Sequence, residues 1–211
     1  MNLANQLTFF RIVLSPVFFV IYLLPRFFPE LFGDNSAWTI PVLWGIFIVS
    51  EITDYFDGLA ARKLNQTSDF GKLFDPFADT LMQLTCFLCF IIDGVYPVNG
   101  IIPAVLFLLV IYREFGILFL RNLMLKKGIT LGARMGGKIK TVAYIIAVGA
   151  ALAAASIERL SVFEFLLPYF KTGALVIFVI SVIIAAASFI DYFLIYQKTK
   201  NQVLVKQESV N

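Results

Sequence analysis

The chain has 211 residues, of which 60% are hydrophobic and only 15% are charged, and its formal net charge is +3. Soluble domains carry charge on about a quarter of their residues, so this composition excludes an ordinary soluble protein and indicates an integral membrane protein. The small net charge gives no reason to expect a nucleic-acid partner. The chain contains no histidine, which excludes histidine metal sites and Ser-His-Asp triads.

Six hydrophobic segments follow a mildly amphipathic stretch at residues 1–11, which predicts a short interfacial helix. The segments are expected at about residues 12–24, 38–57, 73–92, 101–125, 138–156 and 172–196. Most approach the ~20 residues that are needed to cross ~30 Å of hydrocarbon. We therefore expect an all-α, polytopic membrane protein with six transmembrane helices, no cleavable signal peptide and no internal repeat. Residues 1–200 would form one catalytic domain, and residues 201–211 a polar cytoplasmic tail.

Cys86 and Cys89 form a C-x-x-C pattern inside the third hydrophobic segment. A redox pair needs an exposed, electropositive setting. We therefore interpret both residues as small apolar side chains of a buried helix.

Lysine and arginine residues are concentrated in alternate connectors. Thirteen of them lie in the N-terminal stretch, the 62–72 and 121–140 connectors and the C-terminal tail, whereas the opposite loops hold three. The positive-inside rule then predicts that both termini are cytoplasmic. The protein is expected in the cell inner (cytoplasmic) membrane, with residues 54–79 on the cytoplasmic side.

Four aspartates lie at the junction of the second and third segments. Asp54 and Asp57 are spaced i,i+3, and Asp75 and Asp79 i,i+4, so each pair shares one face of a helix. Four unpaired carboxylates near a membrane would be very costly, whereas divalent cations would turn them into a site. Oxygen ligands alone favour Mg²⁺ or Mn²⁺ over Zn²⁺, and four carboxylates suit a two-metal site.

Small residues accompany these carboxylates, namely Gly58, Ala61 and Gly71. They would let a phosphate or nucleotide approach the backbone closely. The alternative interpretation is that the glycines serve helix packing and that the aspartates are caps. That alternative is reasonable for one aspartate and poor for four at this spacing.

These residues form the pattern Asp54-x2-Asp57-Gly58-x2-Ala61-Arg62-x8-Gly71-x3-Asp75-x3-Asp79. The pattern resembles, at every fixed position, the signature of the CDP-alcohol phosphotransferase family, whose members transfer a substituted phosphate from a CDP-linked donor to an alcohol and release CMP. The resemblance implies a metal-dependent membrane enzyme, and a homodimer. It implies metal ligands at Asp54, Asp57, Asp75 and Asp79, with Asp79 also the catalytic base. It implies a CDP site lined by Asp57, Gly58, Ala61, Arg62, Gly71 and Asp75.

The acceptor alcohol is predicted from basic residues farther along the chain. Arg113 lies within an apolar segment, which makes it a functional candidate. Glu114 is adjacent to it and is not expected to pair with it, because neighbouring residues on a helix do not face each other. Arg121 can share a broad face with Arg113, and Lys138 begins the next segment. Guanidinium groups bind phosphate bidentately, so Arg113, Arg121 and Lys138 predict a phosphate-bearing acceptor.

Three stretches, at residues 5–11, 113–121 and 137–141, resemble the phosphatidylglycerophosphate synthase branch of the family. That resemblance implies CDP-diacylglycerol as donor, sn-glycerol 3-phosphate as acceptor and phosphatidylglycerophosphate as product. The chain departs from the branch at Thr80, where lysine is usual.

Other functions remain open at this point. A sibling transferase acting on inositol phosphate, serine or choline would keep the aspartates, although a choline pocket should favour aromatic or acidic groups over arginine. A cation transporter is a remote alternative, because transporter sites tend to lie near the midplane between repeated halves. A purely structural membrane protein is the last alternative.

Overall fold

The computed structural model of the chain describes residues 3–32, 36–63, 69–125 and 135–208, with their side chains except at 3–5, 55–63, 69–76, 79, 125 and 199–208. Every regular element among these residues is helical, as the composition predicts. In chain order they are α1 (Leu3–Phe27), α2 (Pro29–Phe32), α3 (Thr39–Lys63), α4 (Asp69–Ile92), α5 (Ile101–Leu125), α6 (Met135–Leu160), a 3-10 turn (Glu164–Leu166) and α7 (Leu167–Glu208).

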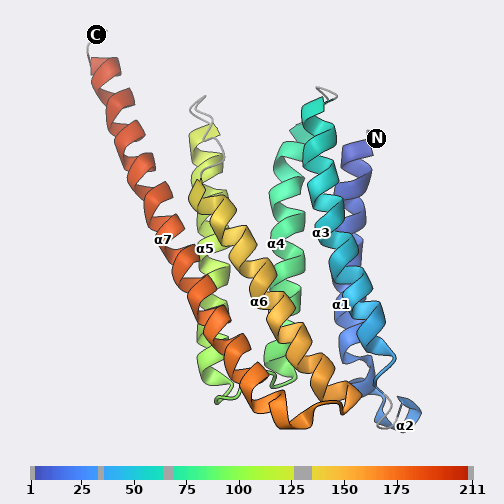
Figure 1. The fold of residues 1–211 in the computed structure, drawn as a ribbon. Helices are drawn as coiled ribbons and strands as arrows, with labels where there is room; N and C mark the ends of the chain where they lie inside the picture. The colour runs from blue at the N-terminus through green and yellow to red at the C-terminus, as the bar shows by residue number, and fades with distance from the viewer. Residues whose placement is uncertain (1–2, 33–35, 64–68, 126–134, 209–211) are drawn as a thin grey trace.

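The long helices run alongside one another, so their ends gather at two ends of a bundle (Figure 1). We call the end at which α3 finishes and α4 begins the signature end. The start of α1, the end of α5, the start of α6 and the end of α7 lie toward it as well. The short helix α2 lies at the other end, which we call the opposite end.

Several helices are apolar and long enough to cross a membrane. Among the described residues four helices meet this criterion, at Gln6–Phe27, Ile101–Met124, Met135–Leu160 and Glu164–Lys198. In hydrocarbon no water is present to bond the backbone N–H and C=O groups, and a helix bonds them within its own segment, which suits these apolar runs. The helices indicate a membrane protein, and the crossing of the membrane by α3 and α4 stays a prediction.

The first helix differs from the expectation of a separate interfacial helix at residues 1–11. Helix α1 runs without a break from Leu3 to Phe27. A helix continues as long as its backbone hydrogen bonds do, and the polar residues that precede the apolar run do not interrupt them. The polar and apolar parts therefore form one element.

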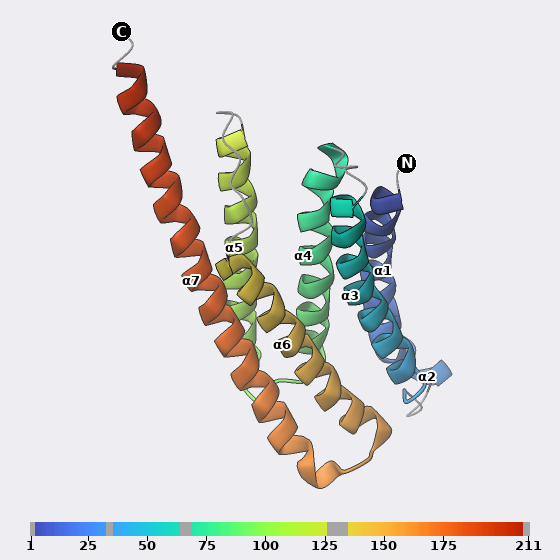
Figure 2. The ribbon, with the colours of Figure 1, turned by 45° about the horizontal axis from the view of Figure 1, so that its top comes forward.

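The last helix also extends past the apolar run that predicted it. Helix α7 has 42 residues, which at 1.5 Å per residue is about 63 Å, roughly twice the hydrocarbon thickness. Figures 1 and 2 show it projecting beyond the other helices at the signature end. The predicted polar tail from residue 201 begins inside this helix.

The helices pack as two groups that are joined through α4. Helix α1 packs against α3 and α4, while α7 packs along α6 and α5, and α4 contacts α5 and α6. Figure 2 shows α1, α3 and α4 together and α6 and α7 together. Between the groups lies an aromatic core, in which the ring of Phe87 is 4.7 Å from that of Phe178 and 5.5 Å from that of Tyr144. Cys86 and Cys89, on the same helix as Phe87, are buried free thiols, as their apolar context predicts.

An arginine joins the two groups at the opposite end. Arg159 of α6 donates hydrogen bonds to the hydroxyl of Thr39, the carbonyl oxygen of Tyr22 and the carboxylate of Asp93, at 3.0, 3.0 and 3.1 Å. Its guanidinium carbon also lies 4.2 Å from the centre of the Tyr22 ring. One side chain therefore connects α6 with α1, the start of α3 and the end of α4, a cluster that we call the Arg159 clamp.

Candidate active site

Both pairs of signature aspartates lie in helices that meet at the signature end. Asp54 and Asp57 belong to the last turns of α3, and Asp75 and Asp79 to the first turns of α4. Six peptide steps join the two helices, so their ends are no more than about 20 Å apart. Figures 1 and 2 show these ends next to each other from two directions.

The described carboxylate of this set, Asp54, is paired with a buried arginine from α1. The Nη1 atom of Arg11 lies 2.5 Å from Oδ1 of Asp54. The arginine side chain is 1% exposed and that of Asp54 is 38% exposed. The contact uses one carboxylate oxygen, and the second leaves Asp54 able to bind a cation. From the sequence, Arg11 is one of the thirteen basic residues that predict the cytoplasmic side. No sequence pattern identifies it as the partner of Asp54.

The other signature positions lie outside the residues whose side chains the structure describes. They are Asp57, Gly58, Ala61, Arg62, Gly71, Asp75 and Asp79, all within α3 or α4. Their roles as metal ligands, as the CDP site and, for Asp79, as catalytic base stay predictions. Among the side chains that are described, no group of three or more His, Cys, Asp or Glu residues could hold a metal ion; three of the four predicted ligands are not in that set.

Arg113 is buried in the middle of α5, where every nitrogen of its guanidinium group has a protein partner. Its Nε donates to the carbonyl oxygen of Ala185 at 3.3 Å and Nη2 to the hydroxyl of Ser188 at 3.1 Å, both on α7. Its Nη1 lies 2.7 Å from Oε1 of Glu114. These contacts stabilise a charged side chain whose burial within an apolar helix would otherwise be costly.

The pairing of Arg113 with Glu114 corrects the expectation that these neighbours would not meet. Neighbouring Cβ atoms on a helix do point about 100° apart. A long arginine side chain nevertheless has enough rotatable bonds to fold back around the helix, and in a buried position both charges need a partner. Helical spacing fixes the direction in which each Cβ atom points. It does not limit how far the rest of a long side chain can extend.

Glu114 also receives contacts from two other helices. The Nζ atom of Lys140, on α6, lies 3.0 Å from Oε1 of Glu114, and the hydroxyl of Thr80, on α4, lies 3.4 Å from Oε2. We call Thr80, Arg113, Glu114 and Lys140 the Glu114 network. Glu114 and Lys140 were missed as site candidates from the sequence. The one available signal was that an acidic residue so deep in an apolar segment must have a cationic partner.

The other two predicted acceptor residues have different surroundings. Arg121 lies two helical turns beyond Arg113, and its Nη2 donates to the hydroxyl of Tyr192 on α7 at 3.2 Å. The structure thus brings both arginines to the side of α5 that faces α7. Lys138 is exposed in the first turn of α6, and its placement beside the arginines stays a prediction.

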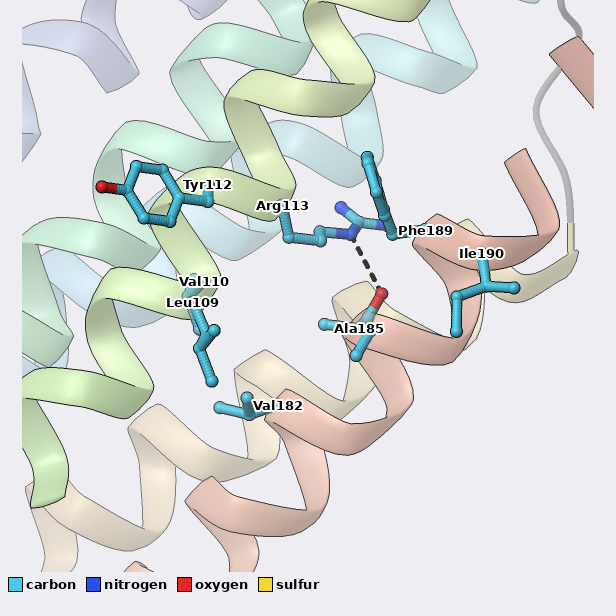
Figure 3. A pocket seen from close by; sticks show the side chains of 9 residues that line it. Leu109, Val110, Tyr112, Arg113, Val182, Ala185, Phe189 and Ile190 are labelled. Carbon is cyan, nitrogen blue, oxygen red and sulfur yellow. Dashed lines mark hydrogen bonds between the residues drawn. The ribbon is translucent and has the colours of Figure 1, made fainter. Parts of the chain in front are cut away.

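A pocket of about 310 Å³ lies between α5 and α7 next to Arg113 (Figure 3). Apolar side chains from both helices form most of its wall, including Leu109, Val110, Val182 and Phe189. Figure 3 shows Arg113 reaching across toward α7 to donate to the carbonyl oxygen of Ala185. Such a wall suits an alkyl chain better than it suits a nucleotide or a small phosphate.

Comparison with known proteins places this arrangement in a family. The family model of CDP-alcohol phosphatidyltransferase matches residues 1–194. A CDP-diacylglycerol–glycerol-3-phosphate 3-phosphatidyltransferase of Treponema pallidum is 36% identical over 200 residues, which is 91% of this chain and 88% of that protein. A protein of the same name in Bacillus subtilis is 40% identical, over 72% of this chain and 76% of that protein. Another in Wigglesworthia glossinidia brevipalpis is 32% identical, over 92% of this chain and 94% of that protein. With the family model matching nearly the whole chain and the signature complete, the protein belongs to the CDP-alcohol phosphatidyltransferase family.

Proposed function

We propose that the protein transfers the phosphatidyl group of CDP-diacylglycerol to sn-glycerol 3-phosphate, giving phosphatidylglycerophosphate and CMP, as a step of phospholipid synthesis. The observation that carries this proposal is the extent of the similarity. Relatives named for this reaction align over 88% and 94% of their own lengths. The similarity therefore includes the acceptor-side helices as well as the signature.

Two divalent cations, Mg²⁺ or Mn²⁺, would be held by Asp54, Asp57, Asp75 and Asp79. The donor set fits them, because it consists of carboxylate oxygens on two helices that meet at the signature end. The ion pair from Arg11 fits too, because metal-binding carboxylates are commonly oriented by a hydrogen-bonding partner. When bound, such cations neutralise the pyrophosphate and stabilise the departing CMP.

The protein groups supply positioning and proton transfer in this reaction. Asp79 accepts the proton of the acceptor hydroxyl. That oxygen forms a bond to the phosphorus that carries diacylglycerol, while the bond from this phosphorus to the CMP oxygen breaks. The CDP group is held at the signature by Asp57, Gly58, Ala61, Arg62, Gly71 and Asp75.

The acceptor phosphate is bound by Arg113, Arg121 and Lys138. Support comes from the two arginines, which lie two turns apart on α5 and both face α7. Arginine suits this task because its planar fork matches phosphate oxygens. Serine and choline carry no phosphate and would leave such a cationic pocket without a partner.

The setting of the reaction is the cell inner membrane, which six helices cross with both termini in the cytoplasm. The lysine and arginine distribution supports this orientation. The active site then faces the compartment that holds nucleotides, CDP-diacylglycerol arrives from the surrounding lipid, and the working unit is a homodimer. Residues 201–211 form the cytoplasmic tail.

The reaction is tested by measuring CMP release from CDP-diacylglycerol by the purified protein with a panel of alcohols. Glycerol 3-phosphate should support release, whereas plain glycerol, serine and choline should be very poor acceptors. Efficient use of serine or choline would refute the assignment as a phosphatidylglycerophosphate synthase. The membership of the family would still hold.

The metal site is tested in the same assay. EDTA should abolish CMP release, and Mg²⁺ or Mn²⁺ should restore it without refolding. Asp79→Asn should lower the rate by on the order of 10²–10⁴, the range for losing a positioned acid–base group. A fully active Asp79→Asn protein would refute its role as the base.

A further inference from the structure

The Glu114 network is a buried polar cluster whose residues come from α4, α5 and α6. Glu114 is 6% exposed, Lys140 6% and Arg113 8%. The two cations approach the same atom, Oε1 of Glu114, at 2.7 and 3.0 Å. One carboxylate therefore fixes the relative positions of two basic groups that come from different helices.

We propose that Glu114 is a positioning residue of the acceptor site, which holds Arg113 and Lys140 together so that both can bind the phosphate of the acceptor. This inference rests on the proposed function, because it assigns a role within the same acceptor site. It also adds Lys140 to the phosphate-binding groups, beside the residues that the sequence indicates. Glu114 does not touch the substrate and acts through the two cations.

The position of the network relative to the signature supports this role. Thr80, whose hydroxyl lies 3.4 Å from Oε2 of Glu114, directly follows Asp79 in α4. The Cα atoms of these two residues are therefore about 3.8 Å apart. A phosphate held by Arg113 and Lys140 would therefore lie beside the first turns of α4, the helix that carries the proposed base.

The donor capacity of the cations supports it as well. A guanidinium group has five N–H donors and an ammonium group three. Three donors of Arg113 are used by Glu114, Ala185 and Ser188. The remaining N–H groups belong to Nη1 and Nη2, which are the atoms that Glu114 and Ser188 hold in place, so they are pre-oriented for a further acceptor such as a phosphate oxygen.

A purely structural salt bridge is the competing explanation, and it predicts different kinetics. If Glu114 only stabilises the packing of the helices, its replacement should lower the thermal stability and weaken the binding of both substrates to the same extent. If Glu114 only screens the cations, its neutralisation should strengthen phosphate binding. A positioning role predicts weaker acceptor binding with donor binding unchanged.

The test compares Glu114→Gln with the wild-type protein in the CMP-release assay. Gln keeps the size of the side chain and removes the charge that holds the two cations. We expect the KM for glycerol 3-phosphate to rise about tenfold or more, with the KM for CDP-diacylglycerol within twofold of wild type. Glu158→Gln is the matched control, because this glutamate forms an exposed ion pair with Lys171 at the opposite end; its kinetics should equal those of wild type.

Two further variants make the result decisive. Combining Glu114→Gln with Lys140→Met should raise the acceptor KM by less than the product of the two single effects, because part of the effect of Glu114 passes through that lysine. If Glu114→Gln fails to fold, Glu114→Asp keeps the charge with a shorter reach and should show a smaller rise confined to the acceptor KM. An unchanged or lowered acceptor KM, or equal changes for both substrates, would overturn the inference. A wild-type protein that does not use glycerol 3-phosphate would instead refute the proposed function itself.

Discussion

Among the described side chains at the signature end, that of Arg11 is the most deeply buried charged one, and its role is open to a direct test. Its contact with Asp54 resembles the partners that orient metal ligands, whose loss typically weakens metal binding about 10–100-fold. We expect Arg11→Met to raise the Mg²⁺ concentration needed for half-maximal CMP release by that factor. Arg26→Met, at an exposed arginine of the opposite end, is the control. An unchanged Mg²⁺ requirement in the Arg11 variant would show that Arg11 does not support the proposed metal site.

Arg121 gives a cleaner test of the acceptor site than Arg113. Its hydrogen bond goes to the neutral hydroxyl of Tyr192, so its removal leaves no buried carboxylate without a partner. Losing one charge-assisted contact costs about 1.5–3 kcal/mol, which is roughly 10–150-fold in affinity. Arg121→Ala should raise the KM for glycerol 3-phosphate by such a factor, while the KM for CDP-diacylglycerol stays constant. An equal rise in both constants would contradict the assignment.

Single residues differ in how far the sequence could identify them. Two properties of the sequence pointed to the candidate site. One is the spacing of the four signature aspartates, and the other is the position of Arg113 deep in an apolar run. The pairing of Arg113 with Glu114 depends on how a long side chain folds around its helix. The burial of Lys140 depends on how α6 packs against α7 and α4. Neither can be read from spacing alone.

At the scale of elements, the Arg159 clamp carries the strongest expectation. The Arg159 side chain is 10% exposed and that of its partner Asp93 23%, so its loss leaves a largely buried carboxylate with the Tyr22 hydroxyl at 3.0 Å and the exposed Arg26 at 3.6 Å as its remaining partners. We expect Arg159→Met to lower the free energy of unfolding by about 2–4 kcal/mol. The measurement is thermal or denaturant unfolding of the purified protein in mild detergent.

The matched control is Lys171→Met at the same end of the bundle. Lys171 is paired with Glu158, whose side chain is 41% exposed, and exposed pairs contribute at most about 1 kcal/mol. Equal losses in the two variants would show that the Arg159 clamp contributes no more than a surface ion pair.

The number and order of the long helices followed from hydropathy, whereas their ends did not. The third apolar segment was expected from residue 73 and the helix begins at Asp69, and the last was expected at 172–196 and the helix runs from Leu167 to Glu208. Hydropathy marks the part of a segment that suits hydrocarbon. Backbone hydrogen bonding marks the helix, and it continues through polar residues. The N-terminal stretch that was expected as a separate helix is part of α1 for the same reason.

At the scale of the whole molecule, the proposed site lies where the two helix groups meet. The signature belongs to α3 and α4, and the basic residues belong to α5 and α6, with α4 in contact with both of the latter. The Arg159 clamp joins the groups at the opposite end, and the Glu114 network joins them in the half nearer the signature. The proposed donor-binding and acceptor-binding groups are thus carried by different parts of the bundle, which the transfer reaction would have to bring together.

The orientation of the whole bundle gives the last prediction. The starts of α1, α4 and α6 and the ends of α3, α5 and α7 lie toward the signature end (Figure 1). Thirteen of the seventeen basic residues belong to the sequence regions at those helix ends. If that end is cytoplasmic, a C-terminal tag should resist protease added to intact spheroplasts and be cut after permeabilisation. A tag inserted between Asp93 and Gly100, at the opposite end, should be cut without permeabilisation and serves as the control for protease access. Cleavage of the C-terminal tag in intact spheroplasts would place the proposed CDP site on the side of the membrane that lacks nucleotides, and both the topology and the reaction would then have to be abandoned.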